Sequence, residues 1–396
     1  MATVNLHRTA ALLLVVSLAT LGADAQAPTQ RPAPAQPAFV RLQADVVAAH
    51  AAHCHALYLA VEQKAKLLAQ AIDALLTAPD ETTLAAARRA WCEARVVYGK
   101  TEVLRFHDGP IEPIEPFLNA WPIDEAYIDA VVGHPTAGIV NDPVRYPSLG
   151  AAVLAIANER GGEANVSTGW HAIEFLLWGQ DLSPDGPGRR PASDFVPGQA
   201  PMATRRGDYL RAVGRQLLTD LATVRAAWDP AHGAYRRSFV ADADGAVRRM
   251  LTGAVVLTAF ELAGERLTVA FETRDQEQEH SCFSDTTCAD LVANQTGIAD
   301  LVRGVATGTN PSPCLLDLVR LRSPEAAQRL EAALAAATAA VQAIPAPFDR
   351  AILGDDDTPG RRAIQQAILA LEAQAEALLV VGRLFGHELP LQPGNR

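Results

Sequence analysis

The residues that best combine chemical function with a defined spacing are His171 and Glu174. They stand three positions apart within residues 167–181, whose apolar side chains predict a helix. Positions i and i+3 of a helix lie on one face, so the imidazole and the carboxylate could share one metal cation. In the alternative interpretation, the glutamate only satisfies a buried histidine by a hydrogen bond, and the pair stabilises the core.

Two ligands are too few for tight metal binding, so further donors must come from other segments. Glu102 is expected on an earlier helix, while His280 and Asp285 border a loop that contains cysteines. Salt bridges, helix caps and solvated loop positions are the alternative roles of these three residues. Imidazole and carboxylate donors suit Fe(II), Fe(III) or Zn(II), so the sequence predicts iron or zinc and leaves the identity of the ion open.

Hydrolysis by zinc would need a third protein ligand, an open position for water and a general base. The sequence has no His-Glu-x-x-His motif, because His387 and Glu388 are followed by Leu-Pro-Leu. A zinc site made of a His-x-x-Glu pair and a distant third histidine, here His280, stays possible. In that case Glu174 would be the catalytic residue. The sequence also lacks Gly-x-Ser-x-Gly, the motif of many serine hydrolases.

Residues 169–174, Gly-Trp-His-Ala-Ile-Glu, match a motif of a known family. They resemble the Gly-x-His-x-x-Glu motif of the imelysin-like proteins of bacterial envelopes, also called insulin-cleaving metallopeptidases. Residues 90–125 resemble the first-domain signature of that family. Residues 261–266 and 279–285, which include Cys-Phe-Ser-Asp, resemble its second-domain signature.

The resemblance implies an all-α protein with two four-helix-bundle-like halves and the motif helix near the interface between them. It also implies a periplasmic or outer-membrane-associated protein of iron acquisition. We therefore expect an exported protein that binds iron or a similar cation for uptake, with an envelope or membrane iron-transport protein as a partner. A metallopeptidase that uses His171 and Glu174 is one alternative. An envelope interaction module with a purely structural His–Glu pair is another.

Helical spacing of apolar residues predicts one helical hairpin near each end of the chain. Residues 40–76 and 81–106 form the first hairpin, and residues 325–343 and 361–385 form the second. Their similarity is a weak internal repeat and suggests two related bundles. Pro- and Gly-rich stretches between the hairpins predict long irregular loops. The intervening helices are expected at residues 125–132, 149–158, 170–178, 209–228, 246–275, 290–304 and 313–321.

We expect a first bundle at residues 39–205 with the Gly-x-His-x-x-Glu motif and a second at residues 206–396 with the Cys-Phe-Ser-Asp segment. Residues 26–38 have the Pro-rich composition of a linker. Residues 1–25 have the pattern of a secretory signal peptide that is cleaved after Ala25. No cysteine lies near that position, which argues against a lipid anchor. No later apolar run reaches the roughly 18 residues that a membrane span needs.

The composition of the 396 residues supports this class of protein. Hydrophobic residues make up 49% of the chain but aromatic residues only 6%, which favours packed helices. The net charge of −11 removes the general attraction to nucleic acid and favours cations as partners. Export would place the five cysteines in an oxidising compartment. Their odd number leaves at least one unpaired, and Cys282 with Cys314 is the expected disulfide.

Overall fold

The computed structural model describes residues 37–305 and 312–393. Every regular element in these ranges is a helix, which confirms the all-α prediction. No helix in the ranges combines the length and the apolar composition that crossing a membrane requires. The predicted signal peptide and all of the predicted linker except its last two residues lie outside the described residues.

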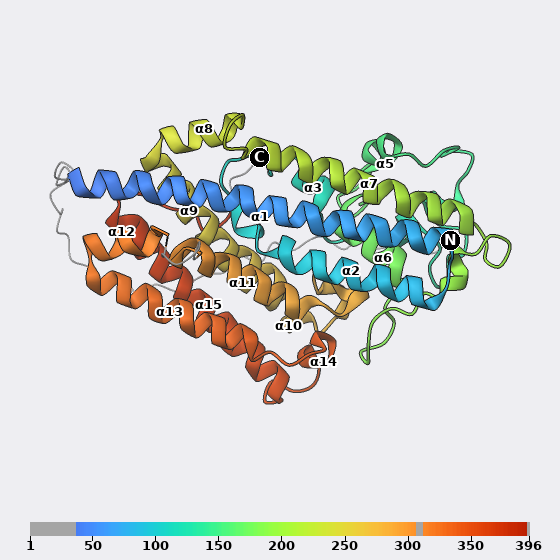
Figure 1. The fold of residues 1–396 in the computed structure, drawn as a ribbon. Coiled ribbons are helices and arrows are strands. Elements are labelled where there is room, and N and C mark those ends of the chain that lie inside the picture. Colours follow the sequence, from blue (N-terminus) through green and yellow to red (C-terminus); the bar gives the residue numbers. More distant parts are fainter. Residues whose placement is uncertain (1–36, 306–311, 394–396) are drawn as a thin grey trace. The chain divides into compact units, whose positions relative to one another are not determined.

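The N-terminal hairpin consists of α1 (Pro37–Thr77) and α2 (Glu81–Gly99), close to the predicted ranges. The buried residues of α1 recur every three or four positions, as an amphipathic helix requires. Asp80 starts α2 because its carboxylate accepts a hydrogen bond from the backbone N–H of Thr83 at 2.7 Å. α1 packs against both α2 and α7 (Ala203–Ala227), and it lies between them in Figure 1.

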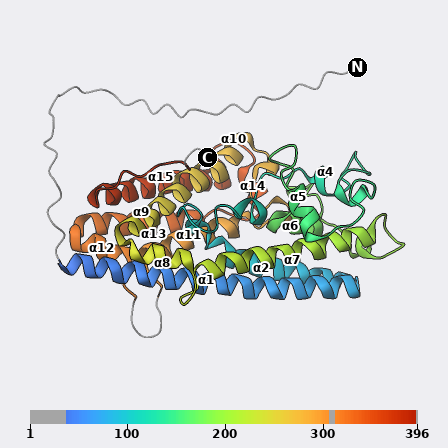
Figure 2. The same cartoon turned by 90° about the horizontal axis from the view of Figure 1, so that it is seen from above.

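The second hairpin consists of α13 (Pro324–Gln342) and α15 (Pro359–Leu384), and these two helices lie together in Figure 1 and Figure 2. α11 (Thr287–Arg303) joins the two ends of the chain, because it packs against α2 as well as α13. Two glycines allow a close approach between α2 and α11. A Cβ atom on Gly99 would lie 2.8 Å from Ala293 Cβ, and one on Gly297 would lie 2.4 Å from the Lys100 carbonyl oxygen.

One long helical stretch changes its winding in the middle. It begins as α9 (Ala243–Val256), continues as the π-helix η4 (Leu257–Thr268) and ends as α10 (Val269–Thr273). π-helical segments are rare and often occur at functional sites. Here the π-helical residues Glu261 and Arg266 face the candidate site described below.

Short helices divide the irregular segments. The α-helices among them are α3 (Glu115–Leu118), α4 (Glu125–Ile128), α5 (Ala151–Ala157), α6 (Gly169–Trp178), α8 (Ala234–Ala241), α12 (Leu315–Arg322) and α14 (Phe348–Ile352). The 3-10 helices are η1 (Glu102–Leu104), η2 (Ile139–Asn141), η3 (Ala192–Phe195), η5 (Gln276–Gln278) and η6 (Cys282–Ser284).

A single cluster of buried apolar side chains runs through the described residues, from α1 to α15. The predicted division between residues 205 and 206 falls near the start of α7. The division into two bundles and the internal repeat therefore stay predictions.

The predicted disulfide is wrong, since all five cysteines are free thiols. Cys314 instead lies at the start of α12, where its thiol donates a hydrogen bond to Asp317 Oδ2 at 3.2 Å. Cys282 is packed in the apolar core. Cys282 and Cys314 are close in the sequence, but one packs in the core and the other begins a helix, so their spacing was no guide to pairing.

Candidate metal centre

The motif helix α6 begins at Gly169, which has a positive φ of 86°. A Cβ atom at this position would lie 2.4 Å from the backbone oxygen of Leu118, so only glycine fits without a shift of the backbone. All ten residues of α6 are buried. The glycine of the motif thus fixes how closely α6 packs against α3, and with it the depth at which His171 lies.

His171 and Glu174 form the pair that their spacing predicts. His171 Nδ1 lies 2.9 Å from Glu174 Oε2, and both side chains are fully buried. Burial raises the pKa of Glu174 to about 8, although hydrogen bonds from Ser284 and the charge of Arg95 act in the opposite direction. Burial, Arg95 and His280 lower the pKa of His171, which keeps its imidazole neutral.

Ser284 connects this pair to the Cys-Phe-Ser-Asp segment. Its backbone N–H and its hydroxyl both donate to Glu174 Oε1, at 3.0 Å and 2.6 Å. The carboxyl group of Glu174 is therefore held from two sides, by the imidazole on one oxygen and by the serine on the other. This contact joins α6 to the 3-10 helix η6.

His280 lies directly beside His171. The centroids of the two rings are 4.9 Å apart, and the indole of Trp121 packs against both rings. Burial, Arg266 and Arg95 lower the pKa of His280, so this second imidazole is also neutral. A neutral imidazole can offer a nitrogen lone pair to a cation, which a protonated one cannot do.

The side chain between the two imidazoles is Arg95, on α2. Its Nη2 atom lies 3.4 Å from His171 Nε2 and 3.2 Å from His280 Nδ1. Asp290 anchors the guanidinium by accepting from Nε and Nη2 at 3.2 Å and 3.1 Å, and Asn119 accepts from Nη1. A guanidinium can only donate, so an imidazole nitrogen that pairs with Arg95 must accept. His280 Nδ1 also lies 3.3 Å from Asp290 Oδ2, to which it donates when it carries the proton. Two imidazoles and a carboxylate therefore surround one positively charged group.

The remaining predicted ligands lie in other arrangements. Glu102 accepts a hydrogen bond from Arg266 Nη2 at 2.8 Å and one from Asn119 at 3.4 Å. Asp285 lies with Asp181 and Asp349, whose carboxylate oxygens approach its own within 4.8 Å. Within residues 37–305 and 312–393, this aspartate group is the only set in which three or more potential ligands lie within 4.8 Å of one another.

The centre opens onto a cleft of about 620 Å³. His280 and Trp121 line it, together with two arginines and several glutamates. Burial raises the pKa of Glu115 in this lining to about 7, despite the opposing charge of Arg105, whose Nη2 lies 3.3 Å from the carboxylate. The cleft could admit a small ion or a small chelate to His280.

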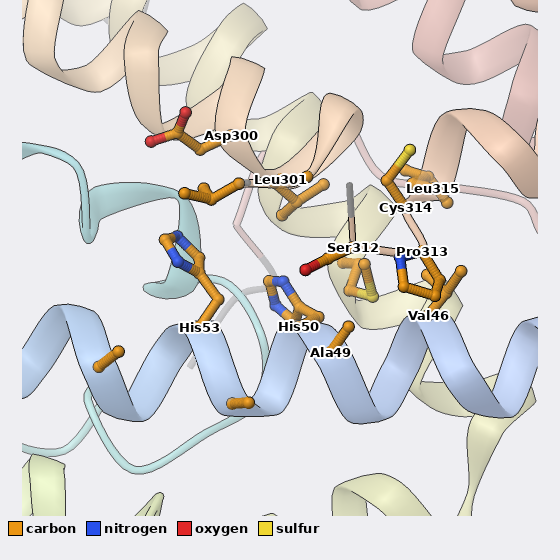
Figure 3. A pocket seen from close by; sticks show the side chains of 15 residues that line it. Val46, Ala49, His50, His53, Asp300, Leu301, Ser312, Pro313, Cys314 and Leu315 are labelled. Atoms are coloured by element: carbon orange, nitrogen blue, oxygen red, sulfur yellow. The ribbon is translucent and has the colours of Figure 1, made fainter. Parts of the chain in front are cut away.

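A second cavity of about 500 Å³ lies beside α1 and contains His50 and His53 (Figure 3). His50 lies 3.4 Å from the thiol of Cys54, and burial lowers its pKa. His53 faces Asp300 across the cavity (Figure 3). Among the described residues, neither histidine belongs to a group of three or more potential metal ligands.

Sequence reasoning missed the roles of Arg95 and Asp290. Arg95 follows Trp91 and precedes Tyr98 on the buried face of α2, and it is only 2% exposed. An arginine within the apolar face of a helix requires a buried partner, so the position of Arg95 in the sequence could have indicated a buried ion pair. The identity of the partner was hidden, because Asp290 lies 195 positions away in the sequence.

Comparisons with known proteins agree with this fold. An iron-regulated protein A of Synechococcus elongatus is 24% identical over 331 residues, which is 81% of this chain and 80% of that relative. The crystal structure of an iron-regulated protein A precursor from Parabacteroides distasonis superposes with a TM-score of 0.70 at 18% identity, and covers 89% of this chain and 97% of its own.

An imelysin-like protein from Psychrobacter arcticum superposes with a TM-score of 0.62 at 14% identity, over 89% of this chain and 96% of its own. These two structures show that the fold is shared. The sequence model of the imelysin family matches residues 54–378, which confirms the resemblance of the motifs. This chain belongs to the imelysin family.

Proposed function

We propose that this protein is an exported metal-binding protein that takes iron, or a similar cation, between His171 and His280 in the cell envelope and serves iron uptake. The observation that carries the proposal is the position of Arg95 Nη2. It is a positively charged group that lies within 3.4 Å of His171 Nε2, His280 Nδ1 and Asp290 Oδ2. Two imidazoles and a carboxylate are donors that suit iron or zinc.

In this proposal a cation replaces Arg95 Nη2 between the two imidazoles. Because the guanidinium is one rigid plane, Arg95 must then swing out of the centre and give up its contacts through Nε to Asp290 and through Nη1 to Asn119. The donors fit the ion chemically, because burial keeps both imidazoles neutral. Asp290 supplies the negative charge that would offset part of the charge of the cation.

Glu174 has a supporting role in this arrangement. When its carboxylate accepts the Nδ1–H of His171, the lone pair of Nε2 is left for the cation. Metal-bound histidines commonly donate their other N–H to a carboxylate, which fixes the tautomer and the ring orientation. Ser284 in turn holds that carboxylate, so a displacement of the 279–285 loop would weaken metal binding.

The relation to iron is supported by the names of two relatives, which describe iron-regulated proteins. Export and the cell envelope are supported by the signal-peptide pattern of residues 1–25. A membrane or envelope protein that receives the iron is the partner that uptake requires.

Metal titration of the purified protein tests the proposal. Fe(II) and Zn(II) are titrated into the wild type and into His171→Asn, and bound metal is measured by elemental analysis after removal of free ions. We expect His171→Asn to bind at least tenfold more weakly, because it loses one of two imidazole donors. His134→Asn, which changes an exposed histidine, is the matched control and should bind as the wild type does.

Equal binding by the wild type and His171→Asn would reject this site. Metal-dependent cleavage of unfolded polypeptides that is lost in Glu174→Gln would instead favour the metallopeptidase. An absence of both metal binding and cleavage would leave the envelope interaction module.

A further inference from the structure

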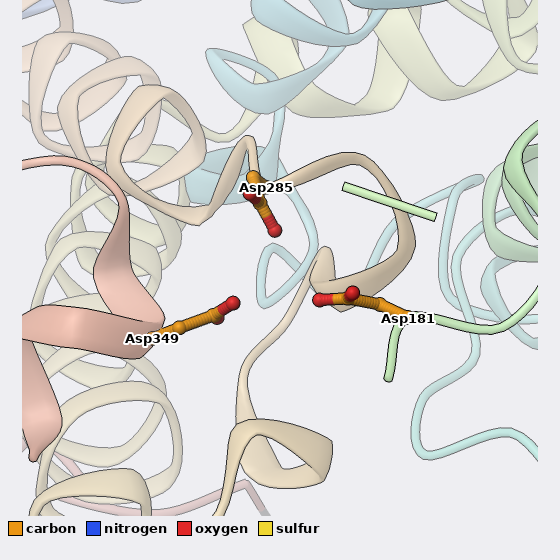
Figure 4. A group of neighbouring side chains, drawn as sticks. All are labelled: Asp181, Asp285 and Asp349. Carbon is orange, nitrogen blue, oxygen red and sulfur yellow. The ribbon is translucent and has the colours of Figure 1, made fainter. Parts of the chain in front are cut away.

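A second group of potential ligands lies outside the His171 centre and consists of three aspartates. One carboxylate oxygen from each of Asp181, Asp285 and Asp349 lies within 4.8 Å of the other two. Figure 4 shows the three side chains pointing toward one central point. The residues come from three segments: the loop after α6, the end of η6 and the helix α14.

Four of the six carboxylate oxygens of this group are buried without a hydrogen-bond donor among the described residues. Asp349 is 1% exposed, and its oxygens have no hydrogen-bond partner among the described residues other than the carboxyl group of Asp181, which can donate only when it is protonated. Asp181 is 2% exposed, and its Oδ2 also has no donor among the described residues, although Ser183 N–H donates to its Oδ1 at 3.2 Å. Such groups are rare in native proteins, because an unpaired buried carboxylate loses its hydration without compensation.

No described basic side chain forms an ion pair with the group, although the charge of Arg189 acts on Asp181 from a distance. Among the described residues, no ion pair includes any of the three aspartates, and the neighbouring Arg350 pairs with Asp185 instead. Burial and the charge of Asp181 raise the pKa of Asp285 to about 6 and that of Asp349 to about 7. Glu277 lies in the same acidic region, and burial with the charge of Glu125 raises its pKa to about 7.

We propose that Asp181, Asp285 and Asp349 bind a hard divalent cation, for which Ca²⁺ is the first probe. The donors are all oxygens, the ligand type of Ca²⁺, Mg²⁺ and Mn²⁺, and neither an imidazole nor a thiolate takes part. Asp285 is only half-buried, so water can reach the site and complete the coordination. The aspartate site is separate from the iron site proposed above. Cation binding at the aspartates does not require iron binding at His171 and His280.

The bound cation would join segments that are far apart in the sequence. Asp349 lies on α14, next to the second hairpin, whereas Asp181 follows the motif helix α6 directly. Asp285 follows Ser284, whose two hydrogen bonds hold Glu174. A cation bound to all three aspartates would therefore hold the 279–285 loop against both α6 and α14.

Calorimetric titration with Ca²⁺ and thermal unfolding in EDTA or in Ca²⁺ test the proposal on the wild type and Asp349→Asn. We expect saturating Ca²⁺ to raise the Tm of the wild type by about 4 °C. Asp349→Asn should lose this response. In EDTA it should be at least as stable as the wild type, because one buried charge has been removed. Asp357→Asn, in an exposed turn, is the matched control and should respond to Ca²⁺ as the wild type does.

Two outcomes would overturn the proposal. If Ca²⁺, Mg²⁺ and Mn²⁺ give neither binding heat nor a Tm shift in the wild type, the aspartates share protons instead of a cation. If Asp349→Asn and Asp285→Asn both bind Ca²⁺ as tightly as the wild type, the cation lies elsewhere. His171→Asn should keep the full Ca²⁺ response. The result for the aspartate site is therefore independent of whether the iron site is rejected.

Discussion

Arg95 is the residue on which the candidate centre depends most. It is buried, and Asp290 and Asn119 hold it in place. Burial alone would lower its pKa, but Asp290 and Glu102 raise it, so the guanidinium stays charged. The positive charge that it places between the two imidazoles makes Arg95 both a structural element and the competitor of any metal ion.

The variant Arg95→Met separates these two roles. Without metal, it leaves Asp290 buried without its guanidinium partner, although Ser281 Oγ still donates to it at 2.7 Å, so we expect a loss of about 3–5 kcal/mol in the free energy of unfolding, measured in urea. Added Zn(II) should restore a large part of this stability, because the cation takes the place of the guanidinium. Arg88→Met on the same helix removes an arginine that donates to backbone carbonyls instead, and it should gain nothing from Zn(II).

At the residue scale, local spacing predicted only part of the centre. The contact of His171 with Glu174 follows from positions i and i+3 of one helix, and the structure contains it. His280 and Asp285 were nominated together as loop residues, yet the structure places them in different groups. The difference arises because the backbone turns at η6 between them, and such a turn depends on tertiary contacts that sequence spacing does not encode.

At the scale of elements, the start of α6 depends on Gly169. The variant Gly169→Ala would combine a strained positive φ with a collision against Leu118, so we expect a loss of about 2–4 kcal/mol in the free energy of unfolding. It should also weaken metal binding, because His171 lies on the first turn of α6. Gly150→Ala, at a position where nothing lies near the added Cβ, should cost less than about 1 kcal/mol. Equal losses in the two variants would contradict this role of Gly169.

The long helix α7 contains a carboxyl group whose burial makes the stability depend on pH. Burial raises the pKa of Asp220 to about 6, and Gln216 is the one described residue that donates a hydrogen bond to its carboxylate. A raised pKa means that the folded state prefers the protonated form, so the contribution of Asp220 to stability is full below pH 4 and is lost as the pH rises through 6.

Asp220→Asn should therefore be more stable than the wild type at pH 8, by on the order of 1 kcal/mol, and close to it at pH 4. Chemical unfolding at the two pH values measures this difference. Asp208→Asn, an exposed change on the same helix, should not show it. A constant difference between Asp220→Asn and the wild type at both pH values would rule out the titration of Asp220 as the cause.

The helices were predictable because apolar periodicity and chain breakers are local. Pro79 and the capping residue Asp80 separate α1 from α2 where expected. The prediction extended the second helix to residue 106, but α2 ends at Gly99, where the chain meets α11. The π-helical winding of η4 was not predictable, because its apolar pattern resembles that of an ordinary α-helix.

For the whole molecule, the continuous core implies that both ends of the chain unfold together. Four of the five tryptophans lie in residues 39–205 and Trp228 lies in residues 206–396, so tryptophan fluorescence reports mainly on the first range, while circular dichroism at 222 nm reports on every helix. We expect the two signals to give the same midpoint in urea, because α11 packs against both α2 and α13. Separate midpoints would show that residues 39–205 and 206–396 unfold as independent bundles.

The two proposed metal sites within this fold differ in their donor atoms. The site at His171 and His280 offers imidazole nitrogens, whereas the site at Asp181, Asp285 and Asp349 offers only oxygens. Soft and borderline ions should therefore favour the first site and hard ions the second.

X-ray absorption at the iron edge of the loaded protein tests the iron site most directly. We predict nitrogen scatterers with the outer-shell pattern of imidazole in the wild type and in Asp349→Asn, and the loss of that pattern in His171→Asn. A shell of oxygens alone in the wild type, unchanged in His171→Asn and lost in Asp349→Asn, would contradict the proposal and place the iron at the aspartates.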